Sequence, residues 1–146
     1  MKMTALADKE AIFDAYEEVR KDDSETNWLV LNFNDENKIA LESTGVDFEE
    51  FREKFTDDVR LFGYLRIISG DELSKRSKFV FITWIGSGVS VLKKAKMSAD
   101  KGSVKDVIRS FAVEELFTDR SDVRESSIRT KVEKAGGANY GTGVRG

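Results

Sequence analysis

Two segments of the chain, residues 59–68 and 79–85, are apolar at both alternating sets of positions over most of their length. Because successive side chains of a strand point to opposite faces of a sheet, such strands are buried on both sides. One face of the first segment would carry Val59, Leu61, Leu65 and Ile67. The other face would carry Phe62, Tyr64 and Ile68. Helices must then cover both faces. The segments predict neighbouring interior strands of a three-layer α/β domain, with Leu65, Phe81 and Trp84 well buried.

Other patterns predict the elements that surround these strands. Residues 28–33 and 38–42 are expected to form a hairpin, and residues 112–117 an edge strand. Asp8 is the expected N-cap of a helix that ends near residues 21–23. Asp47 begins a short helix in a capping-box-like arrangement with Glu50, and three phenylalanines on one side of that helix indicate that it is packed: Phe48, Phe51 and Phe55.

A lysine-rich helix is expected after Gly86-Ser87-Gly88. Its first half would face the core with Leu92, Ala95 and Ala99. Gly102 is expected to interrupt it, and Ser103 to begin a second half that returns apolar side chains to the core.

The last helix is expected to begin at Asp122 and to run to Lys134, where Gly136-Gly137 should stop it. Its apolar stripe is thin, which indicates that one side of it is lightly held or faces a partner.

Length and composition restrict the class of protein further. With 146 residues, the chain fits one domain, expected over residues 1–138, with a disordered tail over 139–146. It has no Cys and no His, which excludes disulfides, thiol chemistry, Cys/His zinc sites and catalysis by imidazole. No apolar run approaches the roughly 18 residues of a membrane span, and the first residues lack a signal-peptide core. The chain is therefore expected to be cytosolic.

Charge is distributed very unevenly along the chain. Residues 1–73 carry 9 basic and 19 acidic side chains, whereas residues 74–105 carry 8 basic side chains and a single acidic one, Asp100. The basic segment includes the end of a polar connection over residues 69–77 and the lysine-rich helix. If the fold brings the connection and the helix together at one end of the sheet, they form a continuous positive surface, which usually faces an anionic partner.

Other candidate sites are explained without chemistry. Asp57 and Asp58 are adjacent as they enter a strand, so their carboxylates point to opposite faces and cannot share a proton. Gly86-x-Gly88 lacks the third glycine and the ribose-binding acid of a dinucleotide site. Nearly every Phe lies on a predicted core face, which argues against stacking platforms for RNA. We therefore expect no enzyme activity, no cofactor, no metal and no nucleic-acid partner.

Several longer blocks of sequence are distinctive: residues 56–62 (TDDVRLF), 70–79 (GDELSKRSKF), 82–86 (ITWIG) and 134–140 (KAGGANY). Together they resemble coactosin-like proteins, within the actin-depolymerising factor/cofilin homology (ADF-H) family. The resemblance covers essentially the whole chain. It implies an α+β fold with a central mixed sheet of five to six strands and helices on both faces, in agreement with the layers predicted above.

The resemblance also implies a function, which is binding to the side of filamentous actin without nucleotide or metal and without the severing typical of cofilins. The filament-facing positions that it carries over are all basic: Lys75, Arg76, Lys78, Lys94, Lys96, Lys101 and Lys105. Actin is an acidic protein, so the charge argument points to the same residues. Lys78 is the first choice for an affinity-determining side chain, because it lies where the connection meets the buried strand.

Two other functions remain open at this point. The same lysines suit a peripheral protein that binds phosphoinositides or other anionic phospholipids, which vesicles would recruit without actin. A cofilin-like depolymerising factor would shorten filaments. The preferred interpretation is a monomeric, non-enzymatic regulator of the actin cytoskeleton in the cytoplasm.

Overall fold

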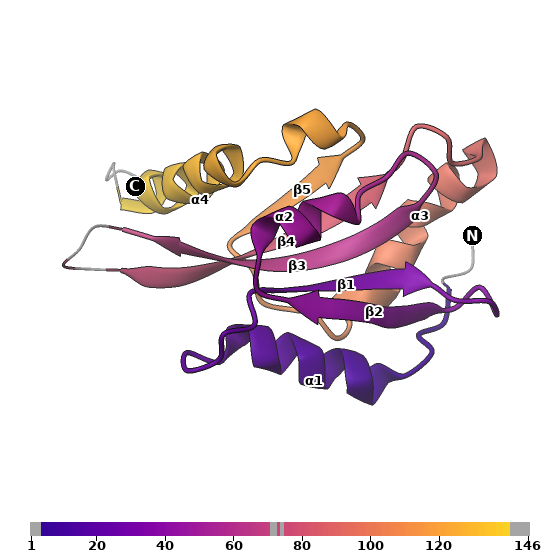
Figure 1. Cartoon of the computed structure of the whole chain (residues 1–146), viewed down its shortest axis with the longest axis horizontal. Coiled ribbons are helices and arrows are strands. Elements are labelled where there is room, and N and C mark those ends of the chain that lie inside the picture. The colour runs from indigo at the N-terminus through magenta and orange to yellow at the C-terminus, as the bar shows by residue number, and fades with distance from the viewer. Residues whose placement is uncertain (1–3, 71–72, 74, 141–146) are drawn as a thin grey trace.

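A mixed five-stranded sheet forms the centre of the computed structural model, which describes residues 4–70, 73 and 75–140 (Figure 1). Its strands are β1 Trp28–Phe33, β2 Ile39–Gly45, β3 Arg60–Ser69, β4 Arg76–Ile85 and β5 Val113–Phe117. They lie in the order β2-β1-β3-β4-β5, with β4 and β5 parallel and the other neighbouring pairs antiparallel. The two predicted interior strands are therefore neighbours inside the sheet, and the predicted edge strand lies at its edge.

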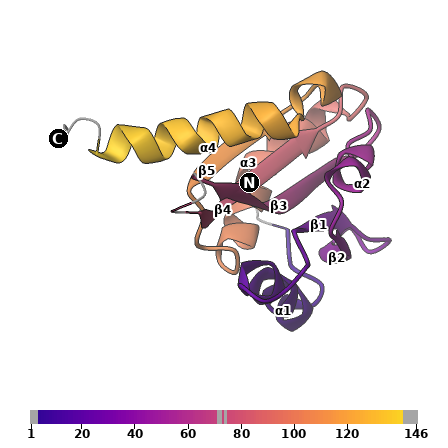
Figure 2. The same ribbon diagram turned by 60° about the vertical axis from the view of Figure 1, so that its left-hand side comes forward.

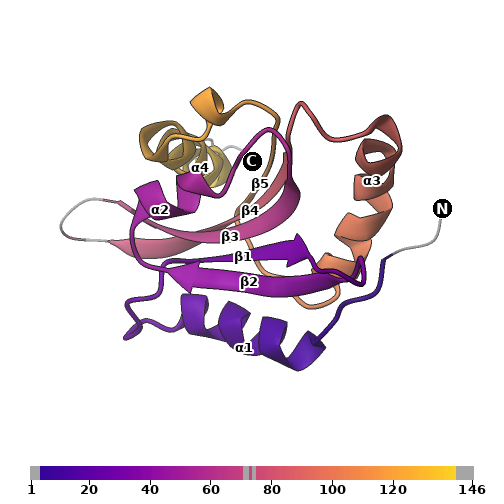
Figure 3. The ribbon, with the colours of Figure 1, turned by 45° about the vertical axis from the view of Figure 1, so that its right-hand side comes forward.

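Helices cover both faces of this sheet, as the apolar strands require (Figure 3). One face carries α1 (Lys9–Arg20) and α3 (Val91–Lys105), and the other carries α2 (Phe48–Glu53) and α4 (Glu125–Tyr140). The Asp8 carboxylate caps α1 as predicted, accepting a hydrogen bond from the backbone N–H of Ala11 at 3.1 Å. Asp47 begins α2 without a side-chain cap bond, so the predicted capping box does not form. The predicted three-layer α+β class is confirmed.

Two hydrophobic cores form, one on each face of β3 and β4. On one face, the core includes Phe62, Tyr64 and Phe81 of these strands. On the other face, it includes Leu61, Leu65 and Trp84. Leu65, Phe81 and Trp84 are at most 2% exposed, as predicted. The prediction that Ile68 lies on a buried face is wrong, because this residue is 44% exposed. β1 pairs with β3 only as far as Leu65, so the end of β3 has left the sheet before Ile68.

The lysine-rich α3 is one continuous helix, so the predicted break at Gly102 is wrong. The Ser90 hydroxyl caps its start by accepting a hydrogen bond from the backbone N–H of Lys93 at 3.3 Å. Leu92 and Ala95, predicted to face the core, are exposed. The first turns of α3 lie beyond the end of the sheet, where no strand covers them (Figures 1 and 3). The buried face is formed further along the helix by Met97, Asp100, Ser103 and Val104.

The last helix differs from the prediction at both ends. A single 3₁₀ turn, Arg120–Asp122, precedes it, so α4 begins at Glu125 rather than at Asp122. α4 continues through Gly136-Gly137 to Tyr140, and the prediction that these glycines stop it is wrong. Of the predicted tail, residues 139 and 140 are the last of α4, and residues 141–146 lie outside the described residues.

Candidate functional site

The ends of β3 and β4 project from the sheet as a two-stranded ribbon (Figure 1). β1 pairs with β3 only between Leu61 and Leu65, and β5 pairs with β4 only from Val80 onward. Within the part of the chain that the structure describes, residues 67–69 and 76–78 therefore pair only with each other. β4 begins at Arg76 rather than at residue 79, so part of the predicted polar connection is strand.

Three basic residues gather on this ribbon, and we call Lys75, Arg76 and Lys78 the hairpin cluster. Lys75 and Arg76 are exposed, and Lys78 is half-buried. Arg76 and Lys78 have the same parity along β4 as the buried Val80, so their side chains continue the face that α2 and α4 cover. None of the three forms an ion pair with another described residue.

Buried contacts fix the base of the ribbon. The ring of Phe79, next to Lys78, stacks on Tyr64 with centroids 5.5 Å apart. The Arg66 guanidinium on β3 is buried and donates to the backbone oxygens of residues 21, 24 and 26 at 2.6–2.8 Å and to the Asn27 side chain at 3.1 Å. A fixed base means that the backbone carrying the hairpin cluster does not have to be ordered when a partner binds. Arg66 was not among the site residues predicted from the sequence.

α4 lies on the same face and runs toward the ribbon (Figures 1 and 2). Ile128 and Val132 bury its thin apolar stripe against the sheet, and the Arg129 guanidinium donates to the backbone oxygen of Ile68 on the ribbon. Lys134, one turn beyond, is exposed and forms no ion pair among the described residues. These basic side chains were not among the predicted site residues. The thin stripe was the sequence feature that indicated a partner-facing side.

The α3 lysines of the predicted site lie elsewhere. α3 begins beyond the end of β4 that is opposite the ribbon, and it packs on the other face of the sheet (Figure 3). The Lys94 ammonium donates to the backbone oxygen of Ser87 at 3.5 Å and forms no ion pair with another described residue. The Lys96 ammonium donates to the Thr4 hydroxyl at 2.6 Å and lies 3.9 Å from the buried Asp100 carboxylate.

The remaining two α3 lysines share one acidic partner. The ammonium groups of Lys101 and Lys105 lie 3.3 and 2.6 Å from the carboxylate of Glu114 on β5. Burial raises the pKa of Glu114, but the hydrogen bonds and charges of the two lysines outweigh burial and leave that pKa below its ordinary value. Part of the positive charge of this surface is therefore neutralised within the protein.

The predicted basic residues thus form two surfaces rather than one continuous surface. β4 is 10 residues long, and a strand of that length spans about 33 Å. It separates the hairpin cluster at its start from the beginning of α3. The alternation of side chains along β4 then places Lys78 on the face opposite α3. The two basic segments are close in sequence, but a whole interior strand lies between them.

The start of α3 combines charge with exposed apolar surface. Val91 is 83% exposed and Leu92 is 75% exposed, and both precede Lys93 and Lys94 in the first turn of the helix. Single exposed apolar residues are common, but two large ones in one turn beside two lysines that form no ion pair with another described residue make a mixed patch that suits a protein partner. We call residues 91–94 the α3 patch.

The glycine turn after β4 is a structural turn. A Cβ atom on Gly86 would lie 2.3 Å from the backbone oxygen of Asp57, and one on Gly88 would lie 3.1 Å from the same oxygen. Both glycines thus allow two chain segments to approach closely. Among the described residues, no group of three acidic side chains could hold a metal ion, and no helix is long and apolar enough to cross a membrane.

The Glu114 pair gives a pH-dependent prediction. Because the folded-state pKa of Glu114 lies below its ordinary value of 4.5, the pair stabilises the fold above that value, and the stabilisation is lost as the pH falls through the folded-state pKa. At pH 7 we expect Glu114→Gln to unfold in urea with a free energy lower by up to about 1 kcal/mol. At pH 3 the difference in the free energy of unfolding between wild type and Glu114→Gln should be smaller. Glu49→Gln, at an exposed position without an ion pair among the described residues, is the control; a gap equally large at both pH values would contradict the prediction.

Comparison with known proteins identifies the fold and then the family. Human coactosin-like protein has a solved structure that matches with a TM-score of 0.85 at 42% identity, covering 90% of this chain and 98% of that one. The fold is therefore that of the actin-depolymerising factor homology proteins. A model of the family "Cofilin/tropomyosin-type actin-binding protein" matches residues 5–133. A rat coactosin-like protein is 46% identical over 138 residues, which cover 94% of this chain and 96% of the relative.

The chain belongs to the cofilin/tropomyosin-type actin-binding protein family, and within it to the coactosin-like proteins. Mouse coactosin, whose solved structure is described as that of an actin filament binding protein, is 44% identical with a TM-score of 0.76, covering 97% of this chain and 99% of that one.

Proposed function

We propose that this protein binds along the side of actin filaments, with the hairpin cluster as its principal contact, and that it neither severs filaments nor catalyses a reaction. The observation that carries the proposal is the near full-length similarity to mouse coactosin, which is described as binding actin filaments. The surface chemistry supports it, because actin is acidic and the hairpin cluster presents cations without ion-pair partners among the described residues.

The α3 lysines enter the proposal with unequal weight. Lys94 lies in the α3 patch beside exposed apolar side chains, and we assign it and Lys96 to a second, smaller contact with the filament. Lys101 and Lys105 contribute least, because Glu114 already offsets their charge. The two contacts lie at opposite ends of β4, so they would engage different parts of the filament surface.

Co-sedimentation with filamentous actin tests this function directly. We expect the protein to pellet with filaments, and we expect the pelleted fraction to fall as salt is added, because the Debye length is only about 8 Å at physiological ionic strength. Filament length in single-filament microscopy and the pool of free monomers should stay nearly constant. Failure to pellet at low salt would reject the function, and rapid shortening of filaments at neutral pH would indicate a cofilin-like depolymerising factor instead.

The same cations give a second candidate, because an anionic membrane surface attracts clustered lysines and arginines. Flotation with vesicles that contain phosphoinositide, with and without actin, distinguishes the two. Under the filament proposal, actin should retain the protein when vesicles are added, and recruitment to vesicles alone would favour the lipid function. We further propose a monomer that acts in the cytoplasm on the cytoskeleton, without a nucleic-acid partner.

A further inference from the structure

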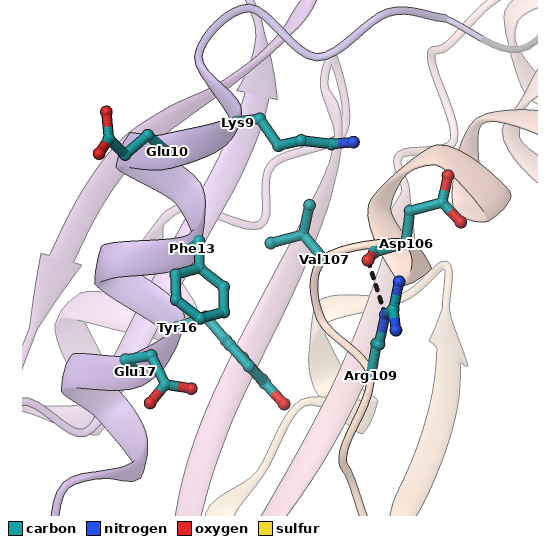
Figure 4. A pocket seen from close by; sticks show the side chains of 8 residues that line it. All are labelled: Lys9, Glu10, Phe13, Tyr16, Glu17, Asp106, Val107 and Arg109. Carbon is teal, nitrogen blue, oxygen red and sulfur yellow. Dashed lines mark hydrogen bonds between the residues drawn. The ribbon is translucent and has the colours of Figure 1, made fainter.

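A cleft of about 690 Å³ lies between α1 and the turn that follows α3 (Figure 4). On the α1 side it is lined by Lys9, Phe13 and Tyr16, and on the side of the turn by Val107 and Arg109. This volume is in the range of ligand-binding clefts, which combine an apolar lining with a few polar groups. α1 and α3 pack on the face of the sheet opposite α4, so the cleft is remote from the hairpin cluster.

The floor of the cleft is aromatic, and hydrogen bonds fix its two walls to each other. Phe13 is 47% exposed, and its ring centroid lies 6.1 Å from that of Tyr16. The backbone N–H of Ser110 donates to the Tyr16 hydroxyl at 3.1 Å, and the Tyr64 hydroxyl donates to the backbone oxygen of Ser110 at 2.6 Å. Because these bonds join α1, the sheet and the turn below the cleft, its width is set before a ligand binds.

Two cations face this aromatic floor. Figure 4 shows the Lys9 side chain extending across the cleft toward the turn, with Arg109 on the opposite wall. Three acidic residues also line the cleft: the carboxylates of Glu10 and Asp106 point away from it, and Glu17 lies below Phe13, at the end of the cleft remote from Lys9. The Arg109 Nε donates to the backbone oxygen of Asp106 at 2.8 Å, which holds the guanidinium in place. Neither cation forms an ion pair with another described residue. This arrangement suits an apolar group joined to a negative charge.

We propose that the cleft is a docking site for a short acidic-aromatic segment of a partner protein. An aromatic side chain of the segment would pack on Phe13 and Val107, and a neighbouring carboxylate would lie between Lys9 and Arg109. The α1 wall runs from Lys9 to Tyr16, a helical rise of about 11 Å, which matches roughly three residues of extended peptide. The hairpin cluster lies on the opposite face of the sheet, and the α3 patch lies at the other end of α3 from the cleft, so a bound segment would cover neither of the two proposed filament contacts. The proposal does not depend on filament binding.

The test uses the whole chain, labelled with ¹⁵N, and a capped tripeptide of sequence Asp-Phe-Glu as the probe. We expect saturable amide shifts confined to residues 9–17 and 106–110. The isosteric peptide Asn-Phe-Gln should bind about tenfold more weakly, because it loses the charge-assisted contacts. Each of the variants Lys9→Glu and Arg109→Glu should bind the acidic peptide more weakly and the neutral peptide nearly as well as wild type does. Lys21→Glu, the same charge reversal just beyond α1 and outside the cleft, should have no effect.

Three results would overturn the proposal. Shifts centred on residues 75–78 would mean that the peptide only follows positive charge. Equal binding of the acidic and neutral peptides would mean that Lys9 and Arg109 do not recognise the ligand. The same would follow if Lys21→Glu lost as much affinity for the acidic peptide as Lys9→Glu and Arg109→Glu do. A concentration-dependent dimer in sedimentation that Phe13→Ser abolishes would mean that a second copy of the chain occupies the cleft.

Discussion

Lys78→Glu is expected to lower filament affinity by at least about tenfold, because it replaces an attraction to an acidic partner by a repulsion at a rigid position. Lys78 is half-buried, so the melting temperature should fall by less than it does for a core substitution such as Leu65→Ala, and a melting curve checks that the variant is folded. Co-sedimentation of wild type and variant over a salt series measures the effect, and the difference between them should shrink as salt is raised.

Two matched charge reversals make this prediction specific. Lys38→Glu changes an exposed lysine in the β1–β2 turn and should bind filaments like wild type. Lys94→Glu changes the α3 patch and should weaken binding less than Lys78→Glu does. If Lys78→Glu binds like Lys38→Glu, or if wild-type affinity is indifferent to salt, the hairpin cluster is not the filament-facing surface. A larger loss in Lys94→Glu would transfer the principal contact to α3.

Leu65→Ala is expected to lower the free energy of unfolding by about 2–5 kcal/mol, because it removes buried methyl groups from a packed core and leaves a cavity. Leu65 is 2% exposed and is paired with Trp28 on one side and Val80 on the other. A loss of this size is a large part of the stability of a small domain. Chemical denaturation of the two proteins measures it.

Ile68→Ala is the matched control, since the same strand carries this second aliphatic side chain, 44% exposed on the ribbon. Its removal should cost well under half as much as the loss at Leu65. Equal losses at the two positions would mean that the ribbon is as tightly packed as the sheet, and a near-neutral Leu65→Ala would contradict the burial of β3 on both faces.

The layers of the fold can be predicted from the sequence, because alternate side chains of a strand face opposite sides of the sheet and their polarity shows which side is buried. Residues 59–68 are apolar at both parities over most of their length, and the buried apolar side chains of the two parities fill the two separate cores. The inner face of α3 could not be read in this way. Its first turns extend past the sheet, so Leu92 is exposed although its spacing suits a core position, and the polar Asp100 is buried. The break predicted at Gly102 is wrong as well, because a glycine lowers helix propensity without by itself ending a helix, and α3 continues through it to Lys105.

The site divides in a similar way between sequence and tertiary structure. The sequence by itself determined the basic residues, the lack of imidazole and thiol chemistry, and the resemblance to coactosin-like proteins, because these depend only on which side chains are present. Tertiary structure decided that the basic residues form two surfaces. In the fold, the whole of β4 separates Arg76 from the start of α3. The fold also pairs Lys101 and Lys105 with Glu114 and places α4 against the ribbon. Such relations depend on where a strand leaves the sheet and on which distant acid lies within reach, and neither is encoded in local spacing.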